Sequence, residues 1–113
     1  MWASAKLKSD IRDLTDGPAL IAGLRPVRYR WIDGQLEDIG LIAEEVAEVI
    51  PELAEYGPDG EVIGVNFRHL GVVLVAAVQE NQAENKLLRE QLDEVQSRLE
   101  AMEILLEKAG FSP

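Results

Sequence analysis

The most regular pattern of apolar positions lies in the last third of the chain. From Leu74 to Leu106, apolar or asparagine side chains recur at alternating steps of four and three residues, without a break. This spacing is typical of the heptad repeat of a coiled coil, and it differs from the wider apolar stripe of a helix on a globular core. We assign position a to Val78, Asn85, Leu92, Leu99 and Leu106, and position d to Asn81, Leu88, Val95 and Met102.

The residues at the heptad positions indicate how the helices associate. Glu84 at g precedes Arg89 at e, and Arg98 at g precedes Glu103 at e, so parallel helices in register bring opposite charges together. Leucine at a with a mixed set at d departs from the dimer pattern of β-branched a and leucine d, which favours higher orders. The repeat therefore predicts a parallel trimer, with a tetramer as the alternative. The two asparagine layers are expected to fix the register and to lower the stability.

The length of this helix bears on what covers its apolar stripe. A helix over residues 68–109 is roughly 60 Å long, at about 1.5 Å per residue. One alternative is an amphipathic helix that folds back on its own domain. The part of the chain that precedes it is too small to cover such a length, so we expect other copies of the chain to do so.

Shorter signals in residues 1–66 predict a first helix and a hairpin. Asp16 before Gly-Pro is typical of a helix start, with the Asp16 side chain as the cap, and the glycine at position 23 is expected to end this helix. Residues 25–31 alternate, with Val27, Tyr29 and Trp31 on one side, which predicts a half-buried strand with the two aromatic rings in the core. A turn at residues 33–34 and a second short strand at residues 39–40 complete the hairpin.

The middle of the chain predicts a second helix and one more strand. Residues 41–50 carry apolar side chains on one side and glutamates elsewhere, and Pro51 stops this helix. A turn at residues 58–60 leads to a strand at residues 62–65, Asn66 caps the long helix, and Gly110 ends it. The expected fold class is α+β. A small region over residues 1–66 is followed by a long coiled-coil helix over residues 67–110 and a tail over residues 111–113.

Composition and charge exclude several classes of function. The net charge is −10, and residues 32–113 hold five basic against eighteen acidic side chains, which argues against binding nucleic acid or anionic membranes. The chain has no cysteine and one histidine, so we expect no disulfide, no thiolate nucleophile, no metal site and no cofactor. The apolar run at residues 71–78 is too short to span a bilayer, and no signal peptide is evident, so a cytoplasmic site of synthesis is expected.

Several blocks of residues, in this order and spacing, resemble a known family. The chain is similar to the intramolecular chaperone auto-processing domain that ends many phage tailspikes, tail fibres and endosialidases. The blocks that carry the resemblance are residues 24–31 (LRPVRYRW), 40–46 (GLIAEEV), 51–53 (PEL), 65–70 (VNFRHL) and 75–80 (VAAVQE).

The resemblance implies a concrete function. Such a domain trimerises, helps an upstream β-rich stalk of the same polypeptide to fold, and is then released by its own serine protease activity. Long intertwined β-structures form slowly because their contacts are non-local. A coiled coil that gathers three chains raises the effective concentration of their strands. The implied place of action is the host cytoplasm during phage assembly, or the virion tail if the domain is retained.

The resemblance also implies the residues of the self-cleavage site. The family motif has a serine, a lysine five residues later, a basic residue between them and an isoleucine three residues after the lysine. When the motif is anchored on Ile11, Lys8 matches the general base, Lys6 the intermediate basic residue and Ala3 the position of the nucleophilic serine. A lysine can accept the serine proton when burial lowers its pKa, but an alanine methyl group has no oxygen to offer. The domain is therefore expected to be cleavage-deficient.

Other interpretations of these residues stay open. Ser4 lies four residues before Lys8, so a helix would bring the two side chains together as an alternative dyad of an active autoprotease. Lys6 and Lys8 are equally typical of a solvated basic face. Glu45 matches a glutamate of the family and is a candidate supporting residue, whereas glutamates in this pattern more often form the wet face of a helix. A plain coiled-coil scaffold without chaperone activity is the remaining alternative.

Overall fold

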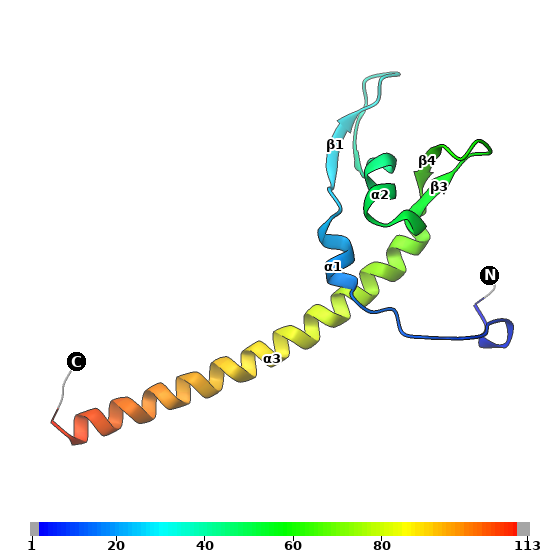
Figure 1. Ribbon diagram of the computed structural model, residues 1–113. Helices are drawn as coiled ribbons and strands as arrows, with labels where there is room; N and C mark the ends of the chain where they lie inside the picture. Colours follow the sequence, from blue (N-terminus) through cyan, green and yellow to red (C-terminus); the bar gives the residue numbers. More distant parts are fainter. Residues whose placement is uncertain (1–2, 111–113) are drawn as a thin grey trace. The chain divides into compact units, whose positions relative to one another are not determined.

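The computed structural model describes residues 3–110. The chain divides into two compact units, Met1–Val78, which we call the small unit because its core is small, and Gln79–Pro113. The order of elements is a 3₁₀ turn η1 (Ala5–Leu7), α1 (Gly17–Ala22), β1 (Val27–Arg30), β2 (Glu37–Gly40), α2 (Ala43–Val49), a 3₁₀ turn η2 (Pro51–Leu53), β3 (Ala54–Tyr56), β4 (Val62–Val65) and α3 (Phe67–Lys108) (Figure 1). Small strands and helices followed by one long helix confirm the α+β part of the expectation. Residues 111–113, the expected tail, lie outside the described residues.

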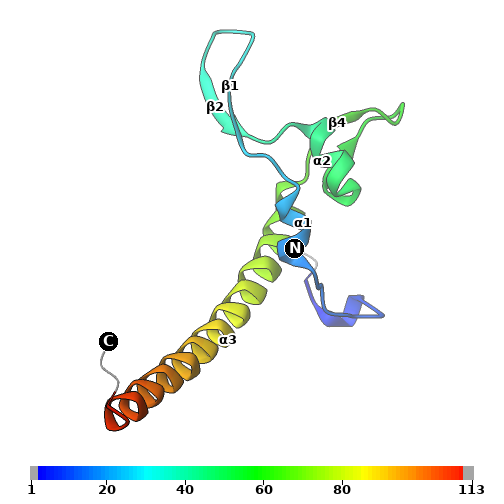
Figure 2. The same cartoon turned by 60° about the vertical axis from the view of Figure 1, so that its left-hand side comes forward.

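Two antiparallel hairpins supply all the strands of the described residues. β1 pairs with β2 with Tyr29 opposite Asp38, and β3 pairs with β4 through an irregular register after Glu55 (Figure 2). The predicted turns are confirmed: Gly34 and Gly60 both have positive φ, at 86° and 83°, a conformation that glycine adopts without strain. Strand β3 was not predicted from the sequence, because Ala54 and Glu55 have low strand propensity. These residues adopt the extended conformation because they pair with β4.

The hydrophobic core is small and is built on the first turns of α3. Its buried side chains come from α2, from the junction that leads into η2, and from η2 and α3. Partly buried side chains from α1, from the segments after α1 and before α2, and from the end of β4 pack against them. The predicted second helix is shorter than expected, since α2 starts at residue 43, and Pro51 begins a 3₁₀ turn at its end. The buried core residues are Val46, Ile50, Leu53, Leu70 and Val73, at 2–8% exposure.

Helix α1 approaches the backbone of α3 very closely. A Cβ atom on Gly17 would lie 2.5 Å from the Ala77 nitrogen and 2.8 Å from the Ala77 Cα. Gly17 is buried and Ala77 is 1% exposed, so two small residues make this approach possible. The predicted side-chain cap is wrong: Asp16 has a left-handed backbone (φ 61°) and makes no capping hydrogen bond, because this backbone turns α1 onto α3.

The two ends of α3 follow the predicted signals. Asn66 Oδ1 accepts a hydrogen bond from the His69 backbone N–H at 3.1 Å, which confirms Asn66 as the cap. Gly110 has φ +86°, and its N–H donates to the Glu107 carbonyl at 3.0 Å, which confirms the C-terminal stop. Among the residues that the structure describes, no helix is long and apolar enough to cross a membrane.

We expect Gly17→Ala to destabilise the small unit by about 1–3 kcal/mol, because the new methyl group meets backbone that cannot yield. The matched control is Gly64→Ala, where the nearest atom is the flexible Glu55 carboxylate at 3.4 Å. This control should stay within about 0.5 kcal/mol of the parent. Urea unfolding followed by circular dichroism at fixed protein concentration measures both. Equal midpoints for the two variants would contradict the close approach of α1 to α3.

Candidate functional site

The segment that carries the predicted cleavage site is exposed and only locally ordered. Ser4 Oγ accepts a hydrogen bond from the Lys6 N–H at 3.2 Å, and this contact caps the 3₁₀ turn η1. Residues 3–16 are exposed, and Leu14, near the end of this segment, lines an apolar hollow together with Leu20 and Val73. The predicted pairing of Ser4 with Lys8 assumed a helix here, and that premise is wrong because the turn spans only Ala5–Leu7.

The structure brings Lys8 to the backbone of Ala3. Lys8 Nζ lies 3.5 Å from the Ala3 carbonyl oxygen, across a separation of five residues. A lysine base next to position 3 is the arrangement that the family motif implies. The Ala3 methyl group offers no hydroxyl, and Lys8 is exposed rather than buried in the single chain. Lys8 therefore lies near residue 3, which has no hydroxyl group.

Glu45 lies away from this segment and bonds to Arg25. Its two carboxylate oxygens accept hydrogen bonds from Arg25 Nε at 3.0 Å and from Arg25 Nη2 at 2.6 Å. The hydrogen bond from Arg25 lowers the pKa of Glu45, and the same bond raises the pKa of Arg25. Glu44 and Glu48 are exposed, as expected for the wet face of α2. Glu45 thus links α2 to the segment that leads into β1, and no local sequence pattern indicates this pairing across twenty residues.

The β1–β2 hairpin holds an aromatic cluster around Asp38. Asp38 Oδ2 accepts hydrogen bonds from Trp31 Nε1 at 3.2 Å and from the Tyr29 hydroxyl at 3.4 Å, and the two rings meet edge to face at 5.2 Å. The backbone hydrogen bond from Ile39, followed by that from Trp31, lowers the pKa of Asp38. Burial and the nearby Asp38 carboxylate raise the pKa of Tyr29. The expectation that Trp31 is a core residue is wrong: it lies beyond the end of β1 and is 52% exposed.

The predicted interface positions of α3 are bare in the single chain. Asn81 and Asn85 are exposed, and the seven apolar positions are 50–58% exposed, namely Val78, Leu88, Leu92, Val95, Leu99, Met102 and Leu106. Arg98, which the heptad register pairs with Glu103 of a second chain, bonds in the single chain to Glu94 of its own helix at 3.0 Å. The bare positions follow one another along α3 at the spacing of the heptad repeat.

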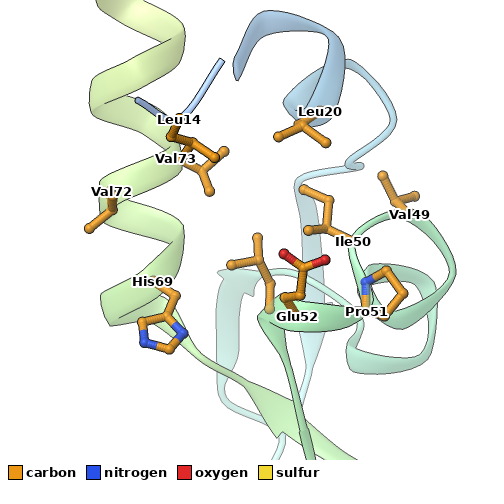
Figure 3. A pocket seen from close by; sticks show the side chains of 10 residues that line it. Leu14, Leu20, Val49, Ile50, Pro51, Glu52, His69, Val72 and Val73 are labelled. Carbon is orange, nitrogen blue, oxygen red and sulfur yellow. The ribbon is translucent and has the colours of Figure 1, made fainter. Parts of the chain in front are cut away.

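An apolar hollow of about 280 Å³ lies between α1, α2 and α3 in the small unit. Leu20, Ile50 and Val73 line it, together with His69 and Val72 of α3 (Figure 3). His69 Nδ1 contacts the Asn66 amide at 3.1 Å, so this ring supports the helix cap. Within residues 3–110, no group of histidine, cysteine, aspartate or glutamate side chains is arranged to hold a metal ion.

Residues 4–55 match the family Peptidase_S74, described as chaperone of endosialidase. Over these residues, which make up a little under half of its length, the chain is similar to the chaperone of endosialidase family. The matched part begins at the cleavage segment and includes both strands of the first hairpin, α2 and η2. This confirms the resemblance. Helix α3 and its heptads lie outside the matched residues. No curated protein matches the chain.

The ion pair between Arg25 and Glu45 makes the stability of the small unit depend on pH. The folded state lowers the pKa of Glu45 below its ordinary value of 4.5, so the pair stabilises the fold above that value and loses its contribution as the pH falls through the folded-state pKa. We expect Glu45→Gln to lower the urea midpoint modestly at pH 7, since both side chains are partly exposed. The difference from the parent should vanish in acid.

Glu44→Gln is the control for this pH series, which urea unfolding at several pH values measures. Glu44 is the exposed neighbour and makes no ion pair within residues 3–110. This variant should follow the parent at every pH. A difference between Glu45→Gln and the parent that persists unchanged in acid would contradict the role of the ion pair.

Proposed function

We propose that this chain is an intramolecular chaperone that trimerises through α3 and assists the folding of an upstream β-rich phage tail fibre or tailspike. The family match over residues 4–55 supports the chaperone role. The observation that carries the trimer is the bare heptad face, where each apolar side chain stays at least half exposed. Burial of one such side chain contributes roughly 1.5–3 kcal/mol, so the face has a large free energy to gain from a partner.

A second copy of the same helix is the partner that fits best. The heptad register places oppositely charged side chains at g and e of adjacent parallel helices, and a symmetric homo-oligomer uses one surface for all its copies. Three copies held in register at α3 keep three upstream chains together. Their strands then meet at a raised effective concentration, which speeds pairing between distant segments.

Self-cleavage is lost in this proposal because position 3 is alanine. The side chain that would attack the preceding carbonyl is a methyl group, while the amine of Lys8 remains 3.5 Å from the Ala3 carbonyl oxygen. The chaperone then stays attached to the fibre, so it acts in the host cytoplasm during assembly and is carried into the virion tail.

Leu99→Asp should convert the trimer to a monomer, because it places three charges in the apolar core of the coiled coil. Ser97→Asp introduces the same residue at an exposed f position two residues earlier and should leave the trimer intact. Sedimentation equilibrium of the parent and both variants measures the mass. A monomeric parent, or equal masses for the two variants, would contradict the proposal of a coiled-coil trimer.

The same pair of variants tests the chaperone role inside the full polypeptide. Leu99→Asp should reduce the yield of soluble trimeric fibre several-fold, as should deletion of residues 1–113, whereas Ser97→Asp should not. If the fibre trimerises equally well in all four proteins, the chaperone role is wrong and a plain scaffold remains.

Ala3→Ser should restore cleavage just before residue 3 when the chain follows a folded reporter. The serine would supply the hydroxyl, and Lys8 would accept its proton. Intact masses of the unchanged chain, of Ala3→Ser and of Ala3→Ser with Lys8→Met measure the outcome, and only Ala3→Ser should shorten. No cleavage in any form would overturn the proposed dyad. Cleavage of the unchanged chain that Ser4→Ala abolishes would instead establish Ser4 as the nucleophile.

A further inference from the structure

A second apolar surface of the small unit is left open beside α3. It is a groove of about 730 Å³, lined by side chains of α1, β1, β2 and the first turns of α3 together with the segments between them, among them Leu24, Val27, Ile39, Phe67, Leu70 and Leu74. Ile39 and Phe67 are 67% and 60% exposed in the single chain. The groove is large enough for several side chains, and none of the described residues 3–110 fills it.

The heptad register reaches this groove when it is counted back from Val78. Phe67 and Leu74 then occupy position d, and Gly71 between them occupies position a. The face of these turns that is buried on the small unit carries Leu70, Val73, Ala76 and Ala77, at positions g, c, f and g. Positions c and f lie on the far side of the helix from a and d, and g lies beside them, so the a and d residues Phe67, Gly71 and Leu74 stay exposed and the bare seam continues to the first residue of α3.

The pairing rule of parallel coiled coils identifies what lies over the groove. Position g of one helix faces position e of the next, five residues further along the chain, as in Glu84 with Arg89. Leu70 is at g and lines the groove. The residue five positions later is Val75, an apolar side chain that is 56% exposed and lines no part of this groove. Val75 of the next copy is therefore directed onto Leu70.

The glycine at position 71 is consistent with close contact between copies. A glycine inside a helix costs about 0.8–1 kcal/mol relative to alanine. A Cβ atom here would meet nothing within 4 Å in its own chain, so packing within the chain does not require the glycine. At position a it lets neighbouring helices approach, which brings the next copy within reach of the groove.

We propose that the groove of each copy receives the first turns of α3 from the next copy, with Val75 seated over Leu70. This inference rests on the proposed parallel trimer and extends its interface from Val78 back to Phe67 and across to β2. The groove and Val75 are different surfaces on the two sides of one helix. Such a heterologous contact closes into a ring of copies when the rotation is threefold.

Two matched pairs of variants test the groove by sedimentation equilibrium. Val75→Asp and Ile39→Asp should each raise the concentration at which the trimer half-dissociates by about tenfold or more, since every copy loses an apolar contact and gains a buried charge. Val72→Asp and Ile32→Asp should leave that concentration unchanged. Val72 is as exposed as Val75 on the same helix, and Ile32 is 97% exposed on the same hairpin as Ile39, but neither lines the groove.

The outcomes separate this inference from the trimer itself. A monomeric parent would overturn the trimer and the groove contact together. A trimeric parent in which Ile39→Asp behaves like Ile32→Asp would overturn the groove contact alone, because the interface would then stop at the helix. If an aspartate variant loses its circular dichroism signal, Val75→Thr and Ile39→Thr replace it, because threonine keeps the β-branched shape. Each threonine variant should raise the concentration at which the trimer half-dissociates, but by less than the aspartate variant.

Discussion

The structure depends on one constraint, which is that α3 has far more apolar surface than its own chain can cover. The small unit buries Leu70, Val73, Ala76 and Ala77, all within the first turns of the helix. Every residue from 81 to 110 is exposed. An apolar face of this length is unfavourable in water, and folding of a single chain offers no means to hide it. In the proposed trimer, association with further copies would remove this surface from water and leave the charged positions outside.

The same helix also organises the small unit. Gly17 of α1 lies against the backbone at Ala77, and the α2 side chains Val46 and Ile50 pack with Leu70 and Val73. The first turns of α3 thus hold the core of the small unit, while the a and d positions of the same turns stay exposed. In the proposed trimer, these turns would couple the small core to assembly, because both tasks use the same helix.

The cleavage segment is the part least determined by this core. Residues 3–16 are exposed, and Lys8 reaches Ala3 through a local contact of the segment with itself. A lysine base requires burial, which the single chain does not supply at this position. A base at this position would therefore require contacts that the single folded chain does not supply.

The sequence by itself determined the local features. Heptad spacing, the glycines at positions 34 and 60, the Asn66 cap and the Gly110 stop all act through neighbours along the chain, and all are found in the structure. The resemblance located Lys8 and Ala3. Tertiary structure alone decided the rest: the partner of Glu45 lies twenty residues away, and β3 exists through pairing with β4. Trp31 lies outside the core and donates a hydrogen bond to Asp38, and Asp16 adopts a left-handed backbone where α1 meets α3. These features depend on contacts between distant segments, and the energies of such contacts cannot be predicted from residues that are neighbours along the chain.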